Sequence, residues 1–140
     1  MADKHLQLGW AKAHIGAVPY AVEIQTGHHR LVADEPKALG GGDTGPPPFG
    51  LLVSALGACT AATLKMYAER KGWPLASLDV ALRYLKGEAG DHIERVLTPH
   101  GPLDAERRAR LADVAERTPV TLAIKGGVAI RTTLSDETPE

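Results

Sequence analysis

Hydrophobic and polar residues alternate in the first third of the chain, as they do in strands with one buried face. Val22 and Ile24 are separated by a polar residue, and this period of two brings apolar side chains to one face of a strand. Gly27 marks a turn shortly after this segment. The pattern predicts three short strands, over about residues 6–14, 20–26 and 30–33.

A loop and a long apolar helix follow these strands. Residues 34–48 read DEPKALGGGDTGPPP, and runs of glycine and proline are typical of loops with fixed bends. We interpret this loop as a rigid bend that aims the next helix. Direct contact with a substrate is the alternative, because a long loop in a small domain is often functional. The helix should run from about Pro48 to Lys71, where Gly72 and Pro74 end it.

The predicted helix is apolar on almost every side. Cys59 lies on one face, whereas the apolar residues Leu51 and Tyr67 fall on the flanks and back. Such a helix needs cover on almost all sides, and one small sheet in a chain of 140 residues would supply too little. We therefore predict a homodimer that buries this helix. The residues expected on the face of Cys59 are Leu52, Ala55, Leu56, Ala62, Thr63 and Met66.

The second half of the chain predicts a hairpin, a second helix and a last strand. Residues 78–85 alternate clearly and should pair with about residues 93–98. Asp104 is a good helix N-cap, and Pro119 should end the second helix. The last strand should cover about residues 128–134. The resulting order, βββ-α-ββ-α-β, indicates a single α+β domain that spans all 140 residues.

Composition and charge exclude several classes of partner. The chain is 44% hydrophobic and 24% charged, with a net charge of −1, so no strong field would hold nucleic acid or an anionic membrane. The N-terminal residues lack the apolar core of a signal peptide, and the apolar part of the central helix is shorter than a membrane span. We expect a cytoplasmic protein that binds neither nucleic acid nor membrane.

Histidine and cysteine leave one candidate for chemistry. The six histidines include no pair at ligand spacing, and His28 and His29 should point to opposite faces of a strand. We expect no metal and no cofactor. The single cysteine, Cys59, excludes an internal disulfide and should stay reduced in the cytosol. It is a candidate for redox chemistry, although a lone cysteine on an apolar helix face is more often a small buried hydrophobe.

Two separated segments of the sequence are distinctive. The first reads GGGDTGPPPFGLLVSALGACTAATLKMYAERKGW from residue 40, and the second reads LDAERRARLADVAERTPV from residue 103. In order and spacing they resemble the OsmC/Ohr family, bacterial proteins of organic-hydroperoxide defence. The resemblance spans about residues 30–134. It implies an OsmC-like fold in which antiparallel sheets surround a long central helix, two chains intertwine as a homodimer, and the active sites lie at the subunit interface.

The resemblance also implies a thiol peroxidase reaction with two cysteines. The first attacks the peroxide, the second forms a disulfide with it, an arginine and a glutamate assist, and an external dithiol restores the thiols. Cys59 matches the first cysteine, but Thr118 stands at the second position and Gly50 at the glutamate. Arg30 is the candidate for the arginine. A threonine hydroxyl forms no disulfide, so this chain cannot complete the two-cysteine cycle by itself.

Two hypotheses about function follow. In the first, the protein is an OsmC-like redox protein of the peroxide-stress response, acting at most as a one-cysteine reductase. Cys59 would attack an organic hydroperoxide, Arg30 would assist, and an external thiol would act as reductant. In the second, the protein is a catalytically silent dimer that binds a small hydrophobic molecule in the former peroxide pocket. Thr118 is then an inert replacement, because no base that would activate its hydroxyl is visible.

Overall fold

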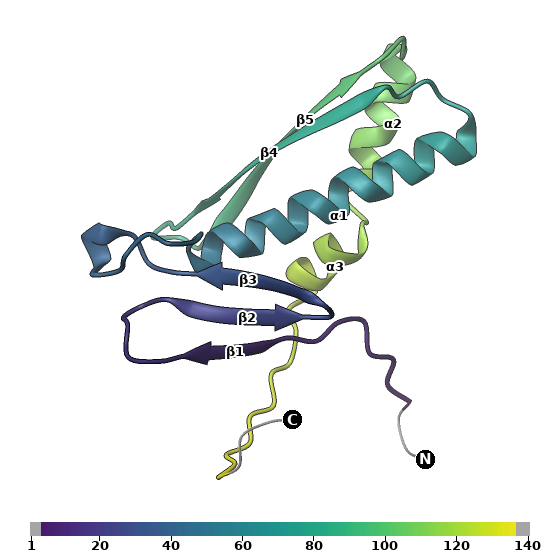
Figure 1. The fold of residues 1–140 in the computed structure, drawn as a ribbon. Coiled ribbons are helices and arrows are strands. Elements are labelled where there is room, and N and C mark those ends of the chain that lie inside the picture. The colour runs from purple at the N-terminus through teal and green to yellow at the C-terminus, as the bar shows by residue number, and fades with distance from the viewer. Residues whose placement is uncertain (1–3, 137–140) are drawn as a thin grey trace. The chain divides into compact units, whose positions relative to one another are not determined.

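The computed structural model describes residues 4–136 and divides the chain into two compact units. The first unit holds the chain up to Ala55 together with Arg83–Glu94. The second holds Leu56–Leu82 together with the chain from Arg95 onward. Helix α1 and both strands of a later hairpin contribute residues to both units (Figure 1). Neither unit is therefore a continuous stretch of chain.

The first unit contains a three-stranded antiparallel sheet in the order β1-β2-β3 (Figure 1). Strand β1 covers Lys12–Ile15, β2 covers Val22–Thr26 and β3 covers His29–Ala33. The alternation predicted for β2 is confirmed, while β1 begins later than residue 6. The strand register places one set of residues on the apolar face of this sheet. These residues are Ala13, Ile15, Val22, Ile24, Leu31 and Ala33.

The loop after β3 is organised by a buried carboxylate. Asp34 is 2% exposed, and its two oxygens accept hydrogen bonds from the backbone N–H groups of Tyr20, Glu35 and Thr44 and from the Thr44 hydroxyl. The Thr44 hydroxyl bond, at 2.6 Å, is the main reason that the pKa of Asp34 falls from 3.8 to about 2, with the backbone donors adding to it and burial opposing it. Gly45 packs so closely on the Val32 carbonyl that a side chain would collide with it. The loop, which includes the short 3₁₀ helix η1 (Lys37–Leu39), is a defined bend.

Helix α1 spans Pro48–Lys71, with both ends as the sequence predicts. Proline suits the first helical position because its missing N–H would have no intrahelical partner. Gly72 adopts a left-handed φ of 70°, and the N–H of Trp73 donates to the Ala68 carbonyl at 2.8 Å, which closes the helix with a Schellman motif.

The second unit is built around a small apolar core. Leu64, Ala68, Leu75, Leu111 and Ala115 are buried together. Strands β4 (Ser77–Leu85) and β5 (His92–His100) form a two-stranded sheet, as predicted. The partly buried residues that pack on the core are Tyr67, Trp73, Leu78, Leu97, Leu103 and Val114. The core therefore joins α1, the hairpin and the helix that follows it.

The C-terminal part differs from the prediction. Helix α2 covers Ala105–Ala115 and is capped by Asp104, as expected, but a third helix, α3, covers Pro119–Gly126. Pro119 begins α3 because proline is favourable at the first helical position. The strand predicted over residues 128–134 is absent from the described part of the chain. An alternating segment becomes a strand only where a neighbouring strand offers backbone partners.

Helix α1 buries one narrow row of side chains. Leu56, Thr60, Leu64 and Ala68 follow each other at intervals of four residues, the spacing of one helix face. Apolar residues elsewhere on α1 remain exposed, among them Phe49, Leu52 and Met66. By length and composition alone α1 could cross a membrane, and the core helices of soluble proteins share this length and composition.

Candidate functional site

Cys59 lies in the middle of α1, beside the buried row rather than in it. Its thiol is free and half-buried, and its sulfur lies 3.9 Å from the hydroxyl oxygen of Thr63, one turn later. Its neighbour Thr60 is fully buried and donates its hydroxyl hydrogen to the Leu56 carbonyl at 2.7 Å. Of the residues predicted to share the face of Cys59, Leu56 is buried whereas Met66 is exposed. The thiol therefore lies at the border between the core and the uncovered side of the helix.

Thr118 occupies the short bend between α2 and α3 and is fully buried. Its hydroxyl oxygen lies 2.6 Å from that of Thr121 on the first turn of α3. Thr121 also donates to the Ala115 carbonyl at 3.3 Å, near the end of α2. Thr118, which the sequence predicts to stand at the second cysteine position, is thus part of a hydrogen-bonded turn.

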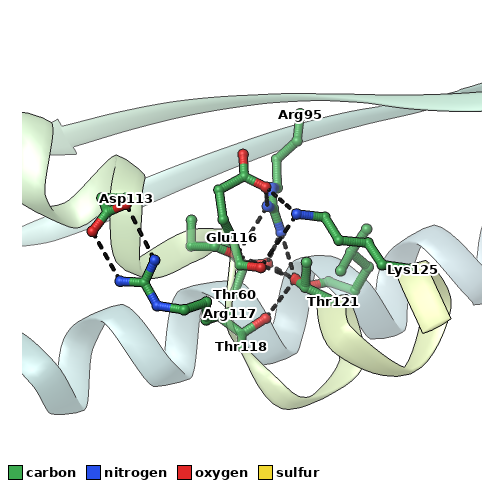
Figure 2. A network of polar contacts seen from close by, with 10 residues as sticks. Thr60, Arg95, Asp113, Glu116, Arg117, Thr118, Thr121 and Lys125 are labelled. Atoms are coloured by element: carbon green, nitrogen blue, oxygen red, sulfur yellow. Dashed lines mark hydrogen bonds and ion pairs between the residues drawn. The ribbon is translucent and has the colours of Figure 1, made fainter.

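Arg95 connects this bend to α1 (Figure 2). One terminal nitrogen of its guanidinium donates to the hydroxyl oxygens of Thr60 at 3.0 Å and Thr121 at 2.9 Å. The other donates to the Ala115 carbonyl at 2.9 Å. The Arg95 side chain is only 12% exposed. Because a guanidinium carries several donors in a rigid plane, one residue of β5 can bond to α1, α2 and α3 together.

A carboxylate on the solvent side of Arg95, that of Glu116, balances its charge. Glu116 lies 3.7 Å from the guanidinium and is 57% exposed, and its carboxylate also accepts a hydrogen bond from Lys125 at 2.6 Å. The Lys125 ammonium lowers the pKa of Glu116, and the charge of Arg95 adds a smaller effect in the same direction. A chain of polar contacts therefore runs from Thr60 in the interior to Lys125 at the surface (Figure 2).

Arg30 and Gly50, the other two positions taken from the family pattern, lie in the first unit. Arg30 is exposed on β3, on the polar face of the sheet, in one cross-strand row with Gln25 and Lys12. Arg30 and Cys59 belong to different units, and the role of Arg30 stays a prediction. At Gly50, an added Cβ would make only ordinary contacts, with Pro47 at 3.5 Å. Steric exclusion at Cβ therefore does not require glycine at this position.

Sequence reasoning missed Arg95, Thr60 and Thr121. One signal was available, because Arg95 stands between Ile93 and Leu97 at alternate positions that otherwise carry apolar side chains. An arginine at such an inward position must find internal acceptors, since a buried charge is costly without them.

The predicted orientation of His28 and His29 is wrong. His28 lies in the turn between β2 and β3 rather than in a strand, and its ring packs on that of His29 with centroids 4.0 Å apart. The two rings therefore do not point to opposite faces, because the strand alternation does not apply in a turn. Within residues 4–136, no group of three or more His, Cys, Asp or Glu side chains could hold a metal ion.

Comparison with known proteins identifies similar sequences and folds. Residues 40–133 match the model of the OsmC-like protein family. No curated protein sequence matches the chain. A crystal structure of an organic hydroperoxide resistance protein OsmC from Legionella pneumophila is 25% identical, with a TM-score of 0.65 over 88% of this chain and 93% of that one.

Two further solved structures share the fold. One is the organic hydroperoxide resistance protein OhrB of Bacillus subtilis, with 24% identity and a TM-score of 0.61 over 87% of this chain and 93% of that one. The other is named an osmotic stress induced and detoxification response protein, from Psychrobacter arcticus, with 13% identity and a TM-score of 0.72 over 88% of this chain and 91% of that one. The α+β fold with antiparallel sheets and a central helix, expected from the sequence, is confirmed.

Proposed function

The chain belongs to the OsmC-like protein family, and from that premise we propose that it is a peroxide-stress protein that reduces organic hydroperoxides with one cysteine and an external thiol. Organic hydroperoxide resistance is named for the similar proteins of Legionella pneumophila and Bacillus subtilis. The observation that carries the one-cysteine reaction is the retained thiol of Cys59 together with the buried threonine at position 118. The reaction needs no bound cofactor or metal.

The proposed reaction balances without a second cysteine. The Cys59 sulfur attacks a peroxide oxygen, so that an S–O bond forms, the O–O bond breaks and the alcohol leaves with a proton. Cys59 is oxidised to a sulfenic acid while the hydroperoxide is reduced. One external thiol then forms a mixed disulfide with Cys59 and releases water, and a second thiol restores Cys59 and leaves as a disulfide.

Arg30 is the proposed assisting cation. A guanidinium near the reacting sulfur would favour the thiolate, which is the nucleophile, and the oxygen that leaves. Arg30 is exposed, and within residues 4–136 its side chain has no hydrogen bond or ion pair that would have to break first. Lys12 lies in the same row on the same face and serves as a matched control.

Turnover with cumene hydroperoxide tests the proposal, with dithiothreitol or dihydrolipoamide as reductant. We expect turnover in the native chain, its loss in Cys59→Ser and its retention in Ser54→Ala, an exposed position on the same helix. Arg30→Gln should lower turnover and Lys12→Gln should not. Equal turnover in Cys59→Ser, or none in the native chain, contradicts the proposal.

We also propose that two copies form a cytoplasmic homodimer, in which the two units of each chain belong to one OsmC-like domain. The family match extends across both units, and the family has a soluble fold. Exposed apolar residues on α1, and Val128, Ile130 and Leu134 after α3, are surfaces that a second copy would cover. Sedimentation at micromolar concentration should give twice the monomer mass of 14.8 kDa.

The second candidate function is a silent dimer that binds a small hydrophobic molecule. It is favoured by the replacement of glutamate at Gly50 and of the second cysteine at Thr118, which leaves the scaffold without half of the family's reactive groups. It predicts a thermal shift with fatty acids and a Cys59 thiol that iodoacetamide labels slowly at neutral pH. Rapid labelling would count against it and in favour of the reductase.

A further inference from the structure

The hydrogen bonds of Arg95 join four segments of the second unit. Strand β5 supplies the guanidinium, α1 supplies Thr60, α3 supplies Thr121, and the end of α2 supplies the Ala115 carbonyl. A single side chain thus hydrogen-bonds to α1, α2 and α3 together. The arginine is therefore the point at which the bend that carries Thr118 is tied to the turn of α1 that carries Cys59.

The protons in this network have a consistent arrangement. The Thr60 hydroxyl donates to the Leu56 carbonyl, so its oxygen is left to accept from Arg95. The Thr121 hydroxyl donates to the Ala115 carbonyl, so its oxygen accepts from Arg95 and from Thr118. Among the described residues, no buried side-chain nitrogen or oxygen is left without a partner. The network is thus complete, and such networks favour one arrangement of the groups they join.

Both terminal nitrogens of the guanidinium are hydrogen-bonded, and the side chain is only 12% exposed. Its terminal nitrogens bond to two hydroxyl groups and a carbonyl, and Glu116 takes the outer side at 3.7 Å. A substrate anion could bind the nitrogen shared by Thr60 and Thr121 only if one of these two bonds broke. Its connection to Cys59 runs through the adjacent residue on the helix, Thr60.

We propose that Arg95 is a positioning residue of the Cys59 site: through Thr60 it holds the turn of α1 that presents the thiol, and through Thr121 and Ala115 it holds Thr118 in the interior. The inference rests on the proposed reductase function for its effect on turnover. Its effects on the thiol and on the bend are independent of turnover. Loss of Arg95 loosens both segments, so Cys59 becomes more accessible to alkylation while hydroperoxide turnover falls, because a small displacement of a reacting group lowers the rate steeply.

The experiment uses the full chain, well below the unfolding temperature of each variant. Three quantities are measured: the rate at which iodoacetamide alkylates Cys59, the amide exchange of residues 115–121, and turnover of cumene hydroperoxide. In Arg95→Met we expect alkylation and exchange to rise at least about tenfold and turnover to fall at least about tenfold, the scale set by losing one buried hydrogen bond. The matched control is Arg83→Met, because Arg83 is an exposed arginine of the same hairpin with one ion-pair partner, Glu94.

Two further variants separate positioning from other roles. Thr60→Val cuts the bond to α1 and leaves the bonds to Thr121 and Ala115, so it should change alkylation and turnover but not exchange in residues 115–121. Arg95→Lys keeps the charge but cannot reach the three acceptors in one plane, so it should not rescue turnover. Rescue by lysine would show that only the charge matters and would overturn the inference.

The other possible results also decide whether Arg95 positions the Cys59 site. Alkylation and exchange in Arg95→Met within twofold of Arg83→Met would overturn the inference, even if stability has fallen. If the native chain turns over no hydroperoxide, the proposed function fails, while alkylation and exchange still test Arg95. If Arg95→Met does not fold, Thr60→Val and Thr121→Val replace it. The inference is refuted if alkylation of Cys59 is unchanged in Thr60→Val and amide exchange of residues 115–121 is unchanged in Thr121→Val.

Discussion

Each unit contains one charged side chain that is buried or almost buried and that organises the backbone around it. The two side chains take their partners from very different distances along the sequence. Asp34 in the first unit accepts hydrogen bonds from residues no more than 14 positions away. Arg95 in the second donates to Thr60, Thr121 and Ala115, which are 35, 26 and 20 positions away. The first shapes a loop, and the second joins separate helices to a strand.

This difference indicates what each charge does for the molecule. A carboxylate surrounded by N–H donors from its own loop stabilises that loop, and its loss should be felt locally. A guanidinium that bonds to three helices stabilises their packing, so its loss should affect the whole unit and the thiol next to Thr60. Four substitutions test this difference between Asp34 and Arg95.

The largest effect is expected for Arg95→Met. It leaves the Ala115 carbonyl and two buried hydroxyl groups with fewer partners, and each such loss destabilises, so the free energy of unfolding should fall by about 3 kcal/mol. Urea denaturation followed by circular dichroism measures it. A loss below about 1 kcal/mol would indicate a replaceable contact rather than a tie between helices.

Thr121→Val tests one arm of the same network. Valine preserves the shape but removes the oxygen to which both Arg95 and Thr118 are bonded, so we expect a loss of about 1.5 kcal/mol. The same denaturation experiment applies. The double variant with Arg95→Met should lose less than the sum of the two single losses, because both changes disrupt one network. Additive losses would contradict that coupling.

Asp34→Asn should have a smaller effect that depends on pH. The folded-state pKa of Asp34, about 2, lies below its ordinary value of 3.8. Its stabilising contribution is therefore fully present above about pH 4 and is lost as the pH falls through about 2. Between pH 5 and pH 2, the native chain should lose stability more steeply than Asp34→Asn. Parallel pH profiles would show that the carboxylate does not stabilise the loop.

The smallest effect is expected for Arg83→Met. Arg83 and Glu94 form an ion pair across the hairpin, but both side chains are largely exposed, at 71% and 46%. Exposed pairs contribute little, so unfolding free energy should change by less than about 0.5 kcal/mol. Thermal unfolding of Arg83→Met and Arg95→Met compares the stability lost when an exposed arginine and a largely enclosed arginine are removed. Similar losses in both would remove the basis for treating Arg95 as special.

The elements predicted correctly are those whose ends are set by local chemistry. Pro48 and Gly72 delimit α1, and Asp104 caps α2 through the backbone of Arg107 at 2.8 Å. Each acts through residues within a few positions of itself, so the sequence contains what is needed to find it. Strand β2 and the β4–β5 hairpin are also predictable from local sequence, because apolar and polar residues alternate within each strand.

The elements predicted wrongly depended on more distant partners. Pro119 was expected to end a helix, yet it begins α3, whose first turn is held by the Arg95 network. Residues 128–134 have the alternation of a strand, but a strand needs backbone partners from another strand. Neither outcome can be decided from the residues of the segment alone.

The residues alone were enough to predict the α+β class, the limits of α1 and the family. The match of Cys59 and Thr118 to the two cysteine positions of that family stays a prediction from the same residues. Only in the folded chain does Cys59 border the buried row of α1 and does Thr118 lie in a network centred on Arg95. The physical reason is that helix ends and strand alternation follow from interactions between near neighbours. The Arg95 guanidinium, in contrast, takes its acceptors from wherever the folded chain brings oxygen atoms within about 3 Å.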